Sequence, residues 1–472
     1  MAHNPSTPLP LPGPARLPLL GHIPTGVRYL RDSLGVAEQL YRDYGPLVGL
    51  ELPRRPVMFA FGPEYNHLLS TDTAQFRSNP LGGLPVPPGS SVETLNSGLV
   101  SMNGEQHRRQ RRLMMPAFHR KQVEGYHTDM AAIIRRRLDA WHPGQPIDLL
   151  REMQALTLEV ALKTLFGLAS GPQAVALAQT INRQIATLSS PGVLLFPRDL
   201  PGTPFRTALR AADGLVAAFR TLIAQKRASQ TPSDDVLAVL IAARDEDGTS
   251  MTERELIAQT YTLFFAGHET TSNALTWTLF LLDQHPQIHA DLLDELTATL
   301  GDSEPSVETL ARLPLLDRVV RESLRLLPPV CILVRQAVAD CTMGGYAVRA
   351  GTLIAFSPYI TQRMPSLYDA PKRFRPARWE TTESDPYSYL PFGGGPRMCI
   401  GSSFALQEIK LVLALLLPRF RLALQPDARI DRHHILTLTP AHGMPMFVNS
   451  QDRRFQRSPV RGNIREMVEL DA

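Results

Sequence analysis

A glycine-rich loop towards the end of the chain holds a single cysteine, Cys399. The loop runs from Phe392 to Gly401 and reads FGGGPRMCIG. Its composition excludes an ordinary helix, because glycine loses much backbone entropy in a helix and proline lacks an N–H donor. The apolar segment from Ser402 to Leu417 predicts a helix whose N-terminal N–H groups favour a thiolate at Cys399. Such a thiolate can act as a nucleophile or as a metal ligand.

A second group of reactive side chains runs from Ala266 to Thr271 and reads AGHETT. It lies inside a long predicted helix, where threonine hydroxyls bond back to the carbonyl four residues earlier and bend the axis. A glycine, an acid and two hydroxyl residues make a poor core. The segment is either a kinked helix with solvated polar groups or a site that moves protons, since a positioned carboxyl group is a general acid or base.

Two further pairs have helical spacing. His107 and Arg111 lie four residues apart in a basic run, and Glu322 and Arg325 lie three apart, so each pair shares a helix face. Alone, an exposed ion pair contributes little to stability, and a basic run is most simply a solvated face. These pairs acquire a function only in combination with the cysteine loop.

The loop from Phe392 to Gly401 resembles the haem-binding loop of the cytochrome P-450 family, in which the cysteine is the axial ligand of the iron. The AGHETT segment resembles the oxygen-activating segment of that family, where a helix opens above the haem. The segment from Phe374 to Trp379, FRPARW, resembles the stretch that contributes an arginine to the family's E-x-x-R pair. The motifs occur in the family's order, and the resemblance covers nearly the whole chain.

The resemblance implies a role for each matching residue. Cys399 would bind the iron, Glu269 would feed protons, and Thr270 would stabilise the bound oxygen for protonation. A buried structural network would consist of Glu322, Arg325 and Arg378. Contacts to the haem or its propionates would come from His107, Arg111, Arg335, Arg397, Phe392, Gly393, Gly401, Ala266 and Gly267.

The implied function is that of a haem-thiolate monooxygenase, with haem b as cofactor and dioxygen as co-substrate. Its electrons would come from NAD(P)H through a ferredoxin or flavodoxin with its reductase, because the chain carries no flavin or nicotinamide fingerprint. A haem-thiolate isomerase, dehydratase or peroxide-driven enzyme remains an alternative, as do a haem-thiolate sensor and a haem-free cysteine hydrolase. The Glu269 and Thr270 pair favours the oxygen-dependent enzyme.

The candidate pocket walls are apolar or small, which favours a hydrophobic substrate such as a fatty acid, a terpenoid or a polyketide. The candidate wall residues are Thr262, Phe265, Val330, Ile332, Leu333 and Met444. Two weakly patterned segments would select the substrate. One is the loop from Leu81 to Gly104, and the other, Ser189 to Pro204, is either a connector or an apolar entrance wall.

A cationic surface is predicted near the start of the helical region. Six cations stand between Glu105 and Lys121 against one Glu, and they are Arg108, Arg109, Arg111, Arg112, Arg120 and Lys121. If this surface lies on the cysteine side of the haem, it would attract an acidic electron carrier.

Length and composition set outer limits. The 472 residues allow one large fold, and the surplus of Lys and Arg over Asp and Glu is only four, too slight to indicate a nucleic-acid partner. Three cysteines indicate a reducing compartment. The sequence has no apolar run long enough for a membrane anchor, so the expected location is the cytoplasm.

The predicted fold is mainly α with small β-sheets, as one haem domain over 19–449, preceded by a proline-rich segment 1–18 and followed by a charged, mobile tail 450–472. A capping box at Thr252 and Glu255 opens the longest predicted helix, which ends near His285. The other predicted helices are Glu105–Met114, Lys121–Trp141, Leu149–Phe166, Pro172–Leu188, Arg206–Ala228, Asp234–Asp245, Gln287–Leu300, Ser306–Leu310 and Leu313–Leu327. The predicted strands are Pro46–Leu52, Pro56–Phe61, a pair within Cys341–Phe356, Phe420–Leu424, and a folded pair within Ile435–Val448.

Overall fold

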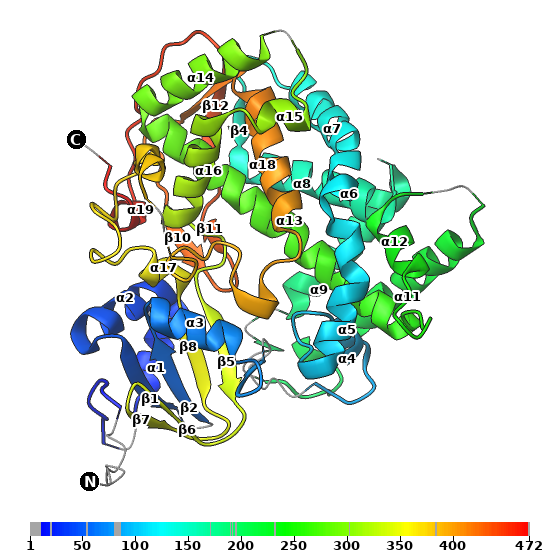
Figure 1. The fold of residues 1–472 in the computed structure, drawn as a ribbon, viewed down its shortest axis with the longest axis vertical. Coiled ribbons are helices and arrows are strands. Elements are labelled where there is room, and N and C mark those ends of the chain that lie inside the picture. The colour runs from blue at the N-terminus through cyan, green and yellow to red at the C-terminus, as the bar shows by residue number, and fades with distance from the viewer. Residues whose placement is uncertain are drawn as a thin grey trace.

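The computed structural model describes residues 11–18, 21–52, 55–79, 86–169, 171–188, 190, 192–193, 196–230, 233–301, 303–382 and 385–470. Figure 1 shows a large helix-rich part and a smaller β-rich part. The prediction of a mainly α protein with small β-sheets is confirmed. Within the predicted proline-rich segment 1–18, residues 1–10 lie outside the described residues.

A five-stranded sheet, in the order β1-β2-β8-β5-β3, dominates the β-rich part. Its strands are β1 Leu47–Leu52, β2 Arg55–Ala60, β3 Phe76–Ser78, β5 Leu333–Ala337 and β8 Leu353–Phe356. The predicted hairpin is confirmed as β1 and β2, which pair antiparallel from Leu47 opposite Ala60. The predicted strands within 341–356 also form, with β6 Cys341–Met343 and β7 Tyr346–Val348 joined through Gly344 and Gly345. Strands β3 and β5 were not predicted.

The helices follow the predicted series closely. The sequence missed the N-terminal helices α1 Ile23–Arg31, α2 Ser33–Tyr44 and α3 Pro63–Thr71, and the short helices α4 Ser91–Leu95, α17 Pro358–Thr361 and α19 Ile464–Met467. The helices that match predicted ones are α5 Gly104–Met114, α8 Leu149–Phe166, α9 Pro172–Leu188, α11 Pro204–Ala228, α14 Pro286–Leu300, α15 Val307–Leu310, α16 Pro314–Leu326 and α18 Ser402–Leu416.

Two predicted helices are wrong in extent. The predicted helix over 121–141 is interrupted at Tyr126, so it becomes α6 Arg120–Gly125 and α7 His127–Asp139. The predicted helix over 234–245 shrinks to α12 Val236–Ala242, because Arg244 leaves the helix and forms a β-bridge with Ser250.

The long helix α13, Glu253–Gln284, passes through the helix-rich part and spans 32 residues. Its predicted capping box is confirmed: the Thr252 hydroxyl accepts a hydrogen bond from the Glu255 N–H, and the Glu255 carboxylate accepts one from the Thr252 N–H. The C-terminal half is almost completely buried, with Trp277 fully inaccessible. A helix of this length carries side chains from one side of the molecule to the other.

Two small sheets lie beside the end of α13. The first has the order β4-β12-β9, with β4 Pro146–Asp148, β9 Phe420–Leu424 and β12 Pro445–Ser450, and the second pairs β10 Arg432–His434 with β11 Leu438–Pro440. The strands predicted within 435–448 form as β11 and β12, but they do not pair with each other. The chain does turn at 441–443, but β11 pairs with β10 and β12 pairs with β9 and β4.

The predicted mobile tail at 450–472 is wrong for its described residues. Ile464, Met467 and Val468 are fully buried and belong to the same apolar cluster as Leu34. Backbone bonds join Ile430 N to Arg461 O at 2.8 Å and Glu469 N to Lys372 O at 2.9 Å. The segment 451–470 is thus part of the folded core. Among the helices of the described residues, none is both long and apolar enough to cross a membrane.

Candidate active site

A cavity of about 400 Å³ lies between α13 and the loop that precedes α18. The motif residues that line it come from segments far apart in the sequence, and they are His107, Arg111, Ala266, Gly267, Thr270, Arg335, Phe392, Gly393, Arg397, Cys399 and Gly401. All the residues that the sequence assigned to haem contacts therefore meet in one cavity. Glu269 is the predicted catalytic residue that does not line it.

The loop around Cys399 is held by its own backbone and by α3. The Cys399 N–H donates to the Phe392 carbonyl at 2.8 Å, which closes the loop. Gly395 has φ of +62°, and a Cβ there would lie 2.5 Å from the carbonyl oxygen of Ser70, so only glycine fits. The loop shape thus depends on this close approach to the end of α3.

The Cys399 side chain lines the cavity and is accessible from it, although protein atoms surround it on its other sides. Burial raises the pKa of its thiol, although the Gly401 N–H and the charge of Arg111 act to lower it. The backbone donor thus favours a thiolate, as predicted, but desolvation of the charged form is the larger effect. A bound metal cation would supply the missing stabilisation.

Three arginines, Arg111, Arg335 and Arg397, and the imidazole of His107 gather at one part of the cavity. Burial lowers the pKa of His107 to about 4, and the charges of Arg397 and Arg111 add to this effect. Burial likewise lowers the pKa of Arg335 and of Arg397 to about 10. Within the described part of the chain, no Asp or Glu pairs with any of these four side chains. Arginines that are buried or partly buried and have no carboxylate partner indicate a site for an anionic group, to which the neutral His107 can donate a hydrogen bond.

Two of the three arginines, Arg335 and Arg397, are held by carbonyl groups. Arg335 Nε donates to the Leu69 carbonyl at 3.2 Å, and Arg397 donates to Asn103 Oδ1 at 2.8 Å and to the Met102 carbonyl. The Nε of Arg397 is buried without a partner. A dianionic cofactor edge, such as two propionates, would satisfy such donors, so the donor set fits haem.

On α13, the hydroxyl groups of the AGHETT segment bond back to the helix. Thr270 Oγ1 donates to the Ala266 carbonyl at 2.7 Å, and Thr271 Oγ1 donates to the Gly267 carbonyl at 2.9 Å. Thr270 and Thr271 line the cavity, whereas the Glu269 carboxylate accepts a hydrogen bond from Thr437. Thr270 therefore lies where the sequence predicts it, with a hydroxyl group at the cavity that could take part in protonating bound oxygen.

The predicted pocket walls are half correct. Thr262, Val330 and Leu333 line the cavity, and Phe265, Ile332 and Met444 do not. Phe265 stacks on Tyr261 one helical turn earlier, and Met444 is fully buried in the core. The sequence missed other apolar lining residues, which include Leu99, Val100, Ala161, Leu165, Ala274 and Leu324. Periodicity could not find these, because a cavity-facing and a core-facing apolar residue have the same spacing.

The two substrate-selecting segments are partly described. Leu99 and Val100 bring the 81–104 loop to the cavity, although this loop also contains helix α4. Within 189–204, Leu194 and Leu195 lie outside the described residues. Val193 is buried against Phe205 and does not line the cavity.

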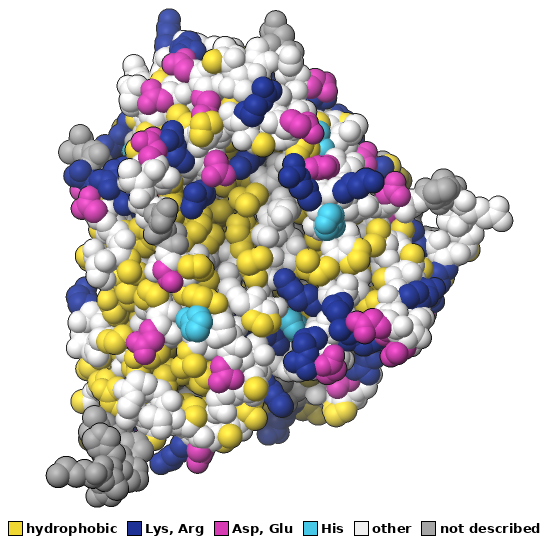
Figure 2. Space-filling model, viewed as in Figure 1, with side chains coloured by type: hydrophobic (Ala, Val, Ile, Leu, Met, Phe, Trp, Pro, Cys, Tyr) yellow, Lys and Arg dark blue, Asp and Glu magenta, His cyan; other side chains and the backbone are white. Residues whose placement is uncertain are grey.

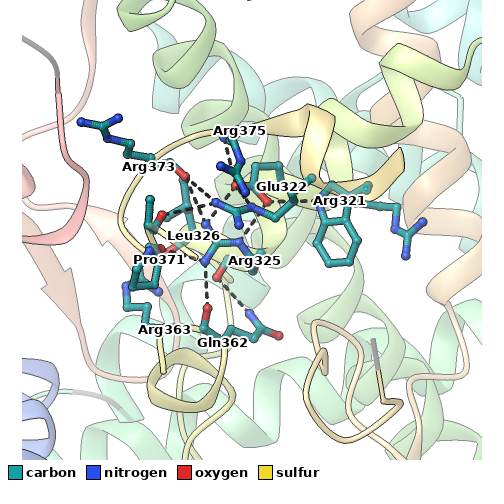
Figure 3. Close-up of polar contacts among 12 residues, drawn as sticks. Arg321, Glu322, Arg325, Leu326, Gln362, Arg363, Pro371, Arg373 and Arg375 are labelled. Carbon is teal, nitrogen blue, oxygen red and sulfur yellow. Dashed lines mark hydrogen bonds and ion pairs between the residues drawn. The ribbon is translucent and has the colours of Figure 1, made fainter. Parts of the chain in front are cut away.

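The predicted E-x-x-R network meets at the Glu322 carboxylate, as Figure 3 shows. Oε1 accepts from Arg378 Nε at 2.8 Å and from Arg325 Nη2 at 2.9 Å, and Oε2 accepts from Trp379 Nε1 at 3.0 Å. Arg325 also donates to the carbonyls of Gln362 and Pro371. Every member is buried, so the network joins α16 to the segment before the cysteine loop.

The predicted cationic surface is largely neutralised. Arg109 pairs with Asp245 at 2.8 Å and with Glu255 at 3.2 Å, and Arg111 faces the cavity, so neither is a free surface cation. Glu105, Glu246 and Glu124 pair with Arg108, Arg112 and Arg120 respectively. Figure 2 shows this mixture of Lys or Arg with Asp or Glu side chains around α5. Counting one acidic residue between Glu105 and Lys121 was misleading, because most of the acidic residues that pair with these arginines come from distant segments of the chain.

Comparison with known proteins gives independent support for the family resemblance. A sequence model of the cytochrome P450 family matches residues 11–444. Pentalenene oxygenase of Streptomyces avermitilis is 37% identical over 88% of this chain and 92% of its own length. Cyclooctatin synthase of Streptomyces melanosporofaciens is 34% identical over 90% of this chain and 93% of its own.

Solved structures agree with this likeness. The structure of retinoic acid-bound cyanobacterial CYP120A1 superimposes with a TM-score of 0.82 at 28% identity, covering 94% of this chain and 100% of that one. The match spans both the helix-rich and the β-rich parts. The cysteine loop, the cavity and these relatives together show that the chain belongs to the cytochrome P450 family and is a haem-dependent monooxygenase.

Proposed function

We propose that the protein hydroxylates a terpenoid. The observation that carries this proposal is the cavity, whose walls beyond the three arginines and His107 are largely apolar. Such walls gain free energy by covering hydrocarbon surface, and they offer few donors to a polar substrate. Two similar proteins are named for terpenoid chemistry, pentalenene oxygenase and cyclooctat-9-en-7-ol 5-monooxygenase. These names favour a terpenoid over a fatty acid or a polyketide.

The chain's own residues would hold haem b in the cavity. The Cys399 sulfur would bind the iron, and His107, Arg111, Arg335 and Arg397 would bind the propionates. Ala266, Gly267, Phe392, Gly393 and Gly401 would surround the ring. When bound, haem supplies the oxygen-activating chemistry of the family. A Cys399→Ala variant tests this ligand assignment: it should lose the thiolate-type spectrum of the carbon monoxide complex, and an unchanged spectrum would refute it.

Protons would pass along α13. Thr270 would hold a proton at Oγ1 beside the cavity, after turning from the Ala266 carbonyl that it now contacts. Glu269 would supply that proton, since its carboxylate lies one residue away and outside the apolar cavity. Water is kept from the remainder of the cavity by its apolar walls, so proton delivery depends on these two side chains.

The electrons would come from NAD(P)H through a ferredoxin or a flavodoxin with its reductase. The docking surface would be the exposed part of α5, η1 (Met115–Phe118) and α6. This surface adjoins the cysteine loop, because Phe118 lies 3.8 Å from the position of a Cβ at Gly401. Lys121 and Met115 are exposed there, and so is Arg112, whose ion pair with Glu246 lies at the surface and can be exchanged for an acid of the carrier. The three free cysteines suit a reducing compartment, which favours a cytoplasmic location.

The docking surface can be tested by charge reversal. A variant with Arg112→Glu and Lys121→Glu should be reduced more slowly by an acidic ferredoxin, and the difference should shrink at high salt. Arg454→Glu is the control, since Arg454 is equally exposed in the C-terminal segment. Equal reduction rates with equal salt dependence in both variants would refute the docking surface.

The substrate class is tested by the shift of the haem absorption from low spin to high spin. Pentalenene, cyclooctat-9-en-7-ol and retinoic acid are compared with a saturated fatty acid of matched carbon number. We expect a saturable shift with at least one terpenoid and a weaker shift with its fatty acid control. A stronger response to the fatty acids would overturn the proposal.

A further inference from the structure

The carboxylate of Glu269 has one hydrogen-bond donor among the described side chains, the hydroxyl of Thr437. Thr437 Oγ1 donates to Glu269 Oε1 at 2.6 Å. That distance lies within the normal range for an O–H···O hydrogen bond. No Lys or Arg in the described ranges forms an ion pair with Glu269. The Thr437 hydroxyl is therefore what fixes the direction of this carboxylate.

Thr437 is itself rigidly held. It lies in the turn between β10 and β11 and is 9% exposed. The neighbouring Leu438 is anchored through both backbone groups: its N–H donates to the Pro329 carbonyl at 2.8 Å, and its carbonyl accepts from Trp277 Nε1 at 2.9 Å. Because Trp277 belongs to α13, the turn contacts the helix that carries Glu269 at two points, through Leu438 with Trp277 and through Thr437 with Glu269.

The strand before the turn is fixed from the other side. His434 Nδ1 lies 2.7 Å from the Ser33 hydroxyl at the start of α2. The Arg432 N–H donates to Asn463 Oδ1 at 2.6 Å, and the Asn463 N–H donates to Asp431 Oδ1 at 2.8 Å. The packed C-terminal segment thus supports the hairpin, and the hairpin presents the Thr437 hydroxyl.

The geometry points to Thr437 as a positioning residue for Glu269, and this inference rests on the proton-supply role proposed above. The hydroxyl holds the carboxylate in one orientation beside the Ala266–Thr270 turn, so that it need not be ordered anew in each catalytic cycle. Glu269 takes a proton from the solvent side and passes it towards Thr270. Thr437 neither gains nor loses a proton.

Two substitutions separate the hydroxyl from the shape of the side chain. Thr437→Val keeps the volume and removes the donor, and Thr437→Ser keeps the donor. Crystal structures of the haem-loaded variants should show Glu269 turned away from position 437 in Thr437→Val and unmoved in Thr437→Ser. The melting temperature and the carbon monoxide spectrum report whether either variant is merely damaged.

The functional readout is hydrogen peroxide released per NADPH consumed, with a ferredoxin and its reductase as electron donors and pentalenene as probe. We expect a several-fold rise in Thr437→Val, a larger solvent isotope effect, and values for Thr437→Ser close to those of the parent. In a Glu269→Ala background, Thr437→Val should change nothing further, because the group that it positions is gone.

Each outcome decides a separate point. An unmoved Glu269 in Thr437→Val, or peroxide release equal to the parent, overturns the positioning role. An equal rise in the Glu269→Ala background also overturns it, since the effect would then bypass Glu269. If Glu269→Ala itself leaves peroxide release unchanged, the proton-supply role of Glu269 is refuted. The Thr437 contact then has no catalytic consequence. The crystal structures still report whether the Thr437 hydroxyl orients the carboxylate.

Discussion

Arg378 Nε donates to Glu322 Oε1 at 2.8 Å, and both side chains are buried. A buried carboxylate is stable only if its lone pairs are satisfied, and Glu322 accepts five hydrogen bonds, two from Arg325 and one each from Arg378, Trp379 and the Arg375 N–H. The guanidinium groups of Arg325 and Arg378 use their remaining donors on backbone carbonyls. The contact therefore fixes the segment that leads into the cysteine loop.

Glu322→Gln should destabilise the protein strongly, because two buried guanidinium groups lose their counter-charge. Removing one partner of a buried ion pair costs about 3–5 kcal/mol. Denaturant unfolding and haem content measure the effect. Glu380→Gln is the control: Glu380 pairs with Arg318 at the surface and is 52% exposed, so its loss should cost less than about 1 kcal/mol. Similar costs for both variants would contradict the prediction.

Thr270→Val should release hydrogen peroxide several-fold faster per NADPH consumed, because the cavity loses its proton-holding hydroxyl. The haem spectrum should be unchanged. Thr276→Val is a matched control, since Thr276 Oγ1 bonds back to the Ser272 carbonyl at 2.7 Å on the same helix but does not line the cavity. A rise of the same size in both variants would assign the effect to helix bending.

Asp283 should make the stability fall as pH rises from 4 to 6. Burial raises its pKa to about 6, against partial compensation by hydrogen bonds from Ser458 and Gln284. The folded state binds the proton more tightly than the unfolded state, so ionisation above this window costs about 3 kcal/mol. Buried histidines, such as His289 with a pKa of about 4, make stability rise with pH over the same range. The difference in the free energy of unfolding between the parent and Asp283→Asn therefore isolates the contribution of Asp283.

The measurement is the free energy of unfolding at several pH values between 4 and 7. Parent minus Asp283→Asn should decrease across this range and level off above pH 6. A difference that does not change with pH would show that Asp283 has an ordinary pKa.

Ile464→Ala should cost about 2–5 kcal/mol, because Ile464 is fully buried and its truncation leaves a cavity. The experiment is a denaturant titration, with Arg454→Ala as an exposed control in the same segment. A protein that tolerates Ile464→Ala as well as Arg454→Ala would have a loosely attached C-terminal segment, contrary to the packing seen here.

Elements with strong local signals could be predicted from the sequence. Leu149–Phe166 was predicted with its exact bounds, since Asp148 caps its start and Gly167, at a φ of +67°, ends it. The capping box of α13 was equally readable. Strands β3 and β5 could not be found, because they are short and depend on pairing with other segments: β5 pairs with β8, and β3 pairs with β5 across more than 250 residues of chain.

The site was predictable where its residues carry unusual chemistry. Cys399 and Thr270 stand in recognisable motifs, and the structure brings both to one cavity. The contact between Glu269 and Thr437 could not be predicted, because nothing in the sequence distinguishes Thr437 from any other threonine in a turn. Arg109 was misjudged for the same reason: its partners Asp245 and Glu255 are more than 130 positions away. Charge neutralisation by distant residues leaves no local pattern.

The hydrogen bond between Arg397 and Asn103 joins residues 294 positions apart. Contacts of such separation form slowly, because the entropy of closing a long loop is lost before the contact is gained. We therefore expect the part of the cavity that holds the three arginines and His107 to assemble late in folding. Capture of an anionic cofactor would complete the folding of this region, since the ligand supplies the charge that holds these segments together.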